Sequence, residues 1–265
     1  MSEVSGKLLK SLAAFANKTA IGAGKILAQG FSQRKNISYK SRIDPVTQFD
    51  LMSEKFIVSR IAKKFPDHGV LTEEGSARPM NDVFRWIIDP LDGTVNFAHG
   101  FPIYCVSIGL EFDDEIIVGA VYDSERKELF RATLGEGAFV NSSRLAVSKE
   151  KNLERALIAT GFAYDISTSK KNNLGYFGRM AKKAQGVRRP GSAALDLCWL
   201  AAGRVDGFWE LKLHPWDTAA ATLIVTEAGG KLSRINSETY SIYKDDLLAS
   251  NGHLHDKMRA VLKGR

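Results

Sequence analysis

The chain has 265 residues, of which 44% are hydrophobic and 25% are charged, and its formal net charge is +7. This composition is typical of an ordinary globular protein, and no apolar run approaches the roughly 20 residues that a transmembrane helix needs. The only two cysteines, Cys105 and Cys198, lie in apolar surroundings, so we expect buried thiols in a reducing cytoplasm and no disulfide framework. Lysines interrupt the apolar pattern of the N-terminal segment, which argues against a signal peptide.

The positive charge favours an anionic partner, such as a phosphate ester, a nucleic acid or an acidic protein surface. It is spread in small clusters: Lys63-Lys64, Lys170-Lys171, Lys182-Lys183 and Arg188-Arg189. Because no long basic tract with interleaved aromatic residues is present, we interpret most of these clusters as solvated surface.

The first half of the chain begins with two predicted helices. Apolar residues recur at helical spacing over residues 4–29, and a second such stripe runs from Leu51 to Phe65. Asp50 is the predicted N-cap of the second helix. The short strand expected at Gly69–Leu71 then leads directly into Glu73.

The stretch from Trp86 to Phe97, WIIDPLDGTVNF, follows. Its apolar run predicts a buried strand that ends at Asp89, since Pro90 cannot extend the strand pairing. Asp89 and Asp92 can aim at one point, and two carboxylates that close are unfavourable without a cation, which suggests a site for a hard metal ion. If a helix starts at Gly93-Thr94, its free N–H groups would favour a phosphate. Taken alone, the pattern is equally compatible with a surface turn.

The remaining elements indicate an α/β protein. Strands expected at residues 103–112, 116–122, 128–133 and 137–141 form a meander, and we interpret the Gly135–Gly137 stretch as a structural turn. Beyond residue 150, expected strands (156–160, 206–210, 247–250) alternate with expected helices (171–185, 192–202, 217–228, 251–262). We therefore divide the chain at residues 1–150 and 151–265, two halves of one compact unit that share an interface.

In the second half, His214-Pro215-Trp216-Asp217 opens an alanine-rich helix. Asp217 stands where an N-cap is expected, and capping alone would explain it. If it instead faces Glu73, Asp89 and Asp92, four carboxylates converge, and such a cluster would suit two or three Mg²⁺ ions.

With these segments, the sequence resembles the inositol monophosphatase family of Mg²⁺-dependent, lithium-sensitive sugar phosphatases, and in particular its bacterial inositol-1-monophosphatase group. The matching segments cover nearly the whole chain in family order: residues 44–50, 71–74, 86–97, 189–194 with Asp196, and 216–230. The resemblance implies the layered α-β-α-β-α sandwich of these phosphatases, usually assembled as a homodimer.

The resemblance also implies a metal site. Glu73, Asp89 and the main-chain carbonyl of Leu91 would hold the first Mg²⁺, and Asp89, Asp92 and Asp217 the second. A third, weaker ion would use Glu73 and waters. Glu73 and Thr94 would orient the attacking water, with Asp50 supporting Thr94 or Glu73. Gly93 and Thr94 would donate N–H groups to the ester phosphate.

The substrate pocket implied by the family lies in the second half. Glu210 would contact substrate hydroxyls, and the segment Gly191, Ser192, Ala193 and Ala194 would line the pocket. A carboxylate there suits a polyol and repels a second phosphate; the alternative is a surface acid at the end of a strand. Arg188 and Arg189 could reach an anionic substrate, but a structural or intersubunit ion pair explains them equally well.

We therefore predict a Mg²⁺-dependent phosphatase acting on myo-inositol monophosphate and related sugar or polyol phosphates. Histidinol-phosphate phosphatase is the alternative, because an amino-alcohol phosphate would also suit Glu210. A bisphosphatase is less favoured, since no basic insertion for a second phosphate is evident. A phosphohistidine at His99 or His214 is disfavoured, because neither has an evident activating partner. An alternative of another class is a regulatory protein that binds RNA or a transcription complex through its basic surface.

Overall fold

A seven-stranded sheet forms the centre of the first half in this computed structural model, which describes residues 4–39, 45–75 and 83–264. Asp44, the first residue of the earliest matching segment, lies outside the described residues. The strand order is β3-β4-β5-β6-β7-β8-β9, and only β3 and β4 pair in parallel. The strands are β3 (Gly69–Thr72), β4 (Phe84–Asp92), β5 (Cys105–Phe112), β6 (Glu115–Asp123), β7 (Glu128–Thr133), β8 (Gly137–Val140) and β9 (Ser143–Arg144).

Two helices cover one face of this sheet, α1 (Gly6–Phe31) and α2 (Gln48–Lys64). The small ribbon of β1 (Ile37–Tyr39) and β2 (Pro45–Thr47) connects them, and the short helix α3 (Thr94–Ala98) follows β4. The predicted meander is confirmed, and the Gly135–Gly137 turn joins β7 to β8. The carboxylate of Glu227 accepts hydrogen bonds from the N–H groups of Gly135 and Gly137 (2.8 and 2.7 Å), so this turn is structural, as expected.

The second half forms a five-stranded sheet of order β11-β10-β12-β14-β13. Its elements are η1 (Leu153–Arg155), β10 (Leu157–Thr160), α4 (Leu174–Ala181), β11 (Gly186–Arg188), α5 (Ala193–Ala201), β12 (Gly207–Leu211), α6 (Pro215–Glu227), β13 (Lys231–Ser233), β14 (Asp246–Ser250) and α7 (His255–Leu262). The sequence did not indicate β11 or β13. Helix α4 is shorter than the predicted 171–185, because the preceding Asn172 and Asn173 side chains bond to loop backbone and the chain after Ala181 turns into β11.

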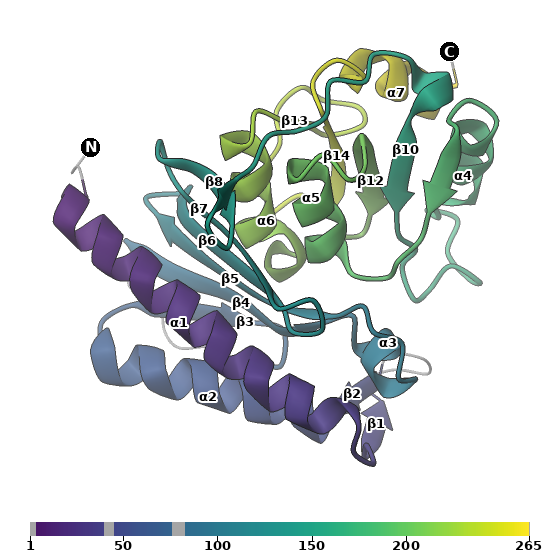
Figure 1. The fold of residues 1–265 in the computed structure, drawn as a ribbon. Helices are drawn as coiled ribbons and strands as arrows, with labels where there is room; N and C mark the ends of the chain where they lie inside the picture. The colour runs from purple at the N-terminus through teal and green to yellow at the C-terminus, as the bar shows by residue number, and fades with distance from the viewer. Residues whose placement is uncertain (1–3, 40–44, 76–82, 265) are drawn as a thin grey trace.

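These elements stack as five layers in the order α-β-α-β-α, which confirms the predicted architecture (Figure 1). Helices α1 and α2 form one outer layer, and α4 and α7 contact each other on the far side of the second sheet. Helices α5 and α6 lie between the two sheets. None of the helices in the described part of the chain has the length and apolar character needed to span a membrane. The division at residue 150 stays a prediction.

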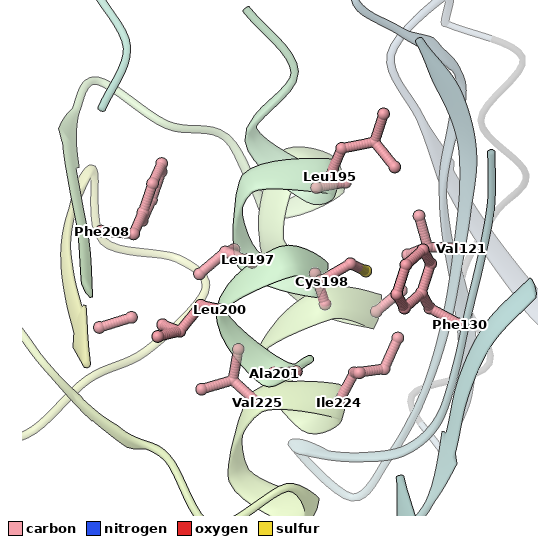
Figure 2. Close-up of a cluster of buried hydrophobic side chains, with 14 of the residues drawn as sticks. Val121, Phe130, Leu195, Leu197, Cys198, Leu200, Ala201, Phe208, Ile224 and Val225 are labelled. Carbon is pink, nitrogen blue, oxygen red and sulfur yellow. The ribbon is translucent and has the colours of Figure 1, made fainter. Parts of the chain in front are cut away.

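The largest core lies around α5, which packs against both sheets (Figure 2). Cys198 points toward Val121 and Phe130 of the first sheet, while Leu197 and Leu200 point toward Phe208 of the second. Both cysteines are free and buried, as predicted. A sequence that is apolar on every side, AALDLCWLA, is what a helix between two sheets requires, so its one charged residue, Asp196, stands out.

Close approach of α6 to the first sheet depends on glycine at position 119. A Cβ on Gly119 would lie 2.3 Å from the carbonyl oxygen of Ala220 in α6, a backbone atom that cannot move alone. We expect Gly119→Ala to lower the free energy of unfolding by about 1–3 kcal/mol or more, through overpacking. Urea titration measures this loss.

The matched control is Gly178→Ala in α4, where a Cβ would meet nothing within 4 Å. Alanine is favoured over glycine inside a helix by roughly 0.5–1 kcal/mol, so this variant should be as stable as the wild type or slightly more stable. Equal stability of both variants would contradict the tight contact between β6 and α6.

Candidate active site

A cavity of about 750 Å³ opens where the ends of both sheets meet the starts of α3, α5 and α6. It is lined by almost every residue that the sequence singled out: Glu73, Asp89, Leu91, Asp92, Gly93, Thr94, Gly191, Ser192, Ala193, Glu210 and Asp217. His214 and Arg189 also line it. His99 and Arg188 are not among the lining residues. The cavity therefore joins the two halves of the chain in one site.

A bulge in β4 brings two of these carboxylates to one face. Asp89 pairs with Ser107 and Asp92 with Cys105, so three steps along β4 correspond to two steps along β5. In a regular strand, residues three apart point to opposite faces, and one extra residue restores the same face. The strand was predicted to end at Asp89, but it continues to Asp92. Pro90 and Leu91 fall where the pairing is interrupted, a position that proline tolerates.

Glu73 reaches the cavity from the neighbouring strand. It follows β3 directly, and its N–H donates to the carbonyl of Ile88 in β4. Because β3 and β4 are parallel, their carboxyl ends meet at the same edge of the sheet. The predicted proximity of Glu73 to the central acids is thus a consequence of strand direction.

Asp217 reaches the cavity from the first turn of α6. The N-cap of α6 is His214, with Pro215 at the first helical position. The prediction of Asp217 as N-cap was wrong: it occupies the third helical position and accepts a hydrogen bond through Oδ2 from the N–H of His214 (2.7 Å). Its other oxygen accepts no hydrogen bond from the residues that the structure describes.

Asp50 lies behind the cavity wall and contacts Thr94. The prediction of Asp50 as N-cap was also wrong, because Thr47 caps α2 and Asp50 completes a capping box with it. Asp50 Oδ2 accepts from the N–H and the hydroxyl of Thr47 (2.9 and 2.5 Å), which leaves Oδ1 at 3.1 Å from the Thr94 hydroxyl. That hydroxyl also lies 2.9 Å from the Leu91 carbonyl, so its single proton can go to either acceptor.

Burial and mutual repulsion dominate the electrostatics of the central acids. Burial raises the pKa of Asp89 well above its usual range, and the charges of Glu73, Asp92 and Asp217 raise it further. Burial also raises the pKa of Asp217. It raises the pKa of Asp92 to about 6, although hydrogen bonds from Ser192 and Ala194 oppose this rise. Ionisation of all these acids is therefore unfavourable when no cation is bound.

These acids fit a hard cation in their chemistry, since carboxylate oxygens are the ligands that Mg²⁺ prefers. Asp92 is held firmly: its Oδ2 accepts from the Ser192 hydroxyl (2.6 Å) and the Ala194 N–H (2.8 Å). Asp89 Oδ1 accepts from the Leu91 N–H (2.9 Å). Within the described ranges, however, no three His, Cys, Asp or Glu side chains already form a group that could hold a metal ion.

Glu210 also lines the cavity and is the last residue but one of β12. Burial, together with the charge of Asp92, raises its pKa to about 8, and the charge of Arg189 opposes this rise. A Cβ on Gly161 would lie 2.2 Å from Glu210 Oε1, so the absence of a side chain at position 161 makes room for this carboxylate. The alternative interpretation of Glu210 as a surface acid is wrong.

The raised pKa of Glu210 gives a pH prediction for the protein kept free of metal with EDTA. A carboxyl group whose pKa rises from 4.5 to about 8 on folding holds more protons in the folded state than in the unfolded state between these values. The free energy of unfolding therefore falls as pH rises through this window, by up to ~1.4 kcal/mol per pH unit. We expect Glu210→Gln to flatten this part of the profile, measured by urea titration from pH 4.5 to 8. Equal slopes for both proteins would contradict the assignment.

The sequence analysis assigned no role to Gly161 or Asp196, both of which line the cavity. The sequence indicated no role for Gly161, because that role is to leave room for the carboxylate of Glu210 in the neighbouring strand β12. Asp196 was part of a matching segment, and its signal was available: a single acid in an otherwise apolar helix.

Comparison with known proteins identifies the relatives of this chain. Residues 8–264 match the inositol monophosphatase family. The chain is 41% identical over 249 residues to inositol-1-monophosphatase of Synechocystis sp., covering 93% of this chain and 87% of the relative. It is 42% identical over 222 residues to Nus factor SuhB of Pasteurella multocida, covering 83% of each. The solved structure of an inositol monophosphatase from Anabaena (Nostoc) sp. superposes with a TM-score of 0.88 at 38% identity, over 97% of this chain and 96% of that one.

Proposed function

Because the chain belongs to the inositol monophosphatase family and is a phosphatase, we propose that its cavity hydrolyses myo-inositol monophosphate and related sugar or polyol phosphates with Mg²⁺. One observation carries this proposal: Glu73, Asp89, Asp92 and Asp217, from three separate segments, line the same cavity as Glu210. The carboxylates supply a place for cations and phosphate, and Glu210 supplies an acceptor for the alcohol.

In this proposal Glu73, Asp89, the Leu91 carbonyl, Asp92 and Asp217 hold two or three Mg²⁺ ions. Bound Mg²⁺ would lower the pKa of a water molecule and neutralise charge on the phosphoryl oxygens. Lithium sensitivity, a general property of the family, belongs to the same proposal.

The other residues position the reactants. The Thr94 hydroxyl, held near Asp50 Oδ1 and the Leu91 carbonyl, can take a proton from a water and pass it toward Asp50, with Glu73 orienting the same water. Gly93, with φ +95°, adopts a conformation suited to glycine and leaves the start of α3 open to a phosphate. Gly191, Ser192 and Ala193 form the wall beside Glu210.

The test is phosphate release from inositol 1-phosphate, histidinol phosphate, fructose 1,6-bisphosphate and adenosine 3′,5′-bisphosphate, each with Mg²⁺, with EDTA and with added Li⁺. The proposal expects the highest kcat/KM on inositol 1-phosphate and no turnover in EDTA. Preference for histidinol phosphate would favour the alternative substrate. Higher efficiency on either bisphosphate would overturn the monophosphate assignment.

A second candidate function is binding to RNA or a transcription complex. The relative named Nus factor SuhB and the net charge of +7 support it. Salt-dependent RNA binding that survives Asp89→Asn would establish this activity as independent of hydrolysis. Absence of binding at low salt would remove it. We also propose a homodimer in the cytoplasm, and light scattering of the purified protein tests the dimer.

A further inference from the structure

Four acids line the cavity without belonging to the proposed metal site, and they fall into two kinds. Asp165 and Asp245, near the rim, each form an ion pair with a lysine, Lys212 and Lys171 respectively. Glu210 and Asp196 form no ion pair among the described residues. Of these four acids, Asp196 is the one that is fully buried.

Asp196 is the more unusual of the two. Its side chain is 1% exposed, and Oδ1 is buried without a hydrogen-bond partner among the described residues. No donor in the described part of the chain bonds to Oδ2 either. In contrast, Asp92 and Asp50 each accept several hydrogen bonds. A buried acid without donors is costly, and it stands in a helix whose other residues are apolar.

Helix capping does not account for Asp196. The N-cap of α5 is Ser192, whose side chain accepts from the N–H of Leu195, and Asp196 lies one residue further on. Burial raises its pKa well above the usual range, the charges of Glu210 and Asp92 raise it further, and Arg189 opposes the rise. Nothing in the described protein satisfies this carboxyl group, while the cavity that it lines can admit a ligand.

We infer that Asp196 is a specificity-determining residue, which accepts a hydrogen bond from a donor on the alcohol part of the substrate while Glu210 accepts a second one. The site then selects phosphate esters whose alcohol carries at least two hydrogen-bond donors, either neighbouring hydroxyls or an ammonium group. This inference rests on the proposed phosphatase function and adds to it a residue and a criterion for the substrate.

The test compares Asp196→Asn and Asp196→Ala with the wild type on inositol 1-phosphate, histidinol phosphate and phenyl phosphate, whose alcohol has no donor besides the ester position. We expect Asp196→Ala to raise KM about 10-fold or more for the first two substrates, because a donor of the bound substrate is left buried without its acceptor. The kcat should change less than KM, and phenyl phosphate should be unaffected.

Asp196→Asn separates the two kinds of donor. An amide oxygen still accepts from a hydroxyl but has no charge to attract an ammonium group. If the donor is a hydroxyl, Asp196→Asn should bind inositol 1-phosphate almost as tightly as the wild type does, unlike Asp196→Ala. If the donor is an ammonium group, Asp196→Asn should weaken histidinol phosphate binding as much as Asp196→Ala does.

Thermal unfolding and a control variant exclude a merely structural role. Asp196→Asn removes an unsatisfied buried acid, so its Tm should equal or exceed that of the wild type. The control variant is Asp165→Asn, because Asp165 lines the same cavity but pairs with a lysine. This variant should leave all three KM values unchanged. A lower Tm for Asp196→Asn, an equal rise of KM on all three substrates, or no change on any would overturn the inference. Failure of the wild type to hydrolyse phenyl phosphate and the other esters would instead count against the phosphatase proposal itself.

Discussion

Replacement of Asp92 by asparagine should reduce kcat by roughly 100-fold or more while the protein stays folded. Asp92 is 9% exposed, and Oδ2 accepts from Ser192 and Ala194. The asparagine oxygen can keep these two bonds, so the backbone around the bulge in β4 should not move. The amide nitrogen cannot bind a cation, and loss of several kcal/mol of transition-state stabilisation corresponds to this decrease in rate. Asp217→Asn should behave in the same way.

Steady-state kinetics at saturating Mg²⁺ measure this effect, and thermal unfolding in EDTA measures the fold. Without metal, Asp92→Asn should be at least as stable as the wild type, because one charge has left a crowded group of acids. Asp245→Asn is the control, since Asp245 lines the same cavity but pairs with Lys171. Retention of most activity by both Asp92→Asn and Asp217→Asn would show that the proposed ligand assignment is wrong.

Removal of divalent cations should abolish hydrolysis completely and lower the stability of the wild-type protein. The folded protein alone gathers Glu73, Asp89, Asp92 and Asp217 around one cavity, so Mg²⁺ should bind the folded state and not the unfolded chain. At 100 times its Kd, such a ligand adds about 2.7 kcal/mol to the free energy of unfolding. Mg²⁺ should therefore raise Tm in a concentration-dependent way, with a larger shift at pH 8 than at pH 5, because protons compete for these acids.

Differential scanning calorimetry with increasing Mg²⁺ tests this prediction without relying on activity. Asp92→Asn and Asp217→Asn should lose most of the Mg²⁺-dependent shift, whereas Asp245→Asn should keep it. An equal shift in all four proteins would place the stabilising cation elsewhere. Full activity in EDTA would contradict the metal-dependent mechanism.

Much of the site could be predicted from the sequence because its residues stand in long, specific segments. The stretch Trp86–Phe97 and the pair Trp216-Asp217, at their observed separation, indicated the family, and the family implied which acids share a site. Apolar periodicity located most helices and strands within a few residues, since burial of one face or of both faces leaves a pattern that needs no tertiary knowledge. The stacking of five layers followed from the resemblance and not from periodicity.

Local patterns failed where two interpretations of a residue compete. Asp50 and Asp217 both precede apolar runs, which is how an N-cap looks in a sequence, yet each lies at the third helical position in a capping box. The true N-caps are Thr47 and His214, and the second of these is an uncommon capping residue. Both helices therefore begin earlier than predicted, and a different residue caps each of them. Asp50 and Asp217 still lie at or beside the cavity.

The sequence by itself determined the family, the layered fold and five of the acids that line the cavity, Glu73, Asp89, Asp92, Glu210 and Asp217. Only the tertiary structure decided how they face one another: the bulge between Asp89 and Asp92 turns two carboxylates onto one face, and the packing of α6 on Gly119 sets the position of Asp217. The isolation of Asp196 was also invisible in the sequence. The hydrogen-bond donors that could satisfy a buried acid come from segments distant in the sequence, so a local sequence pattern cannot show whether such a donor is present.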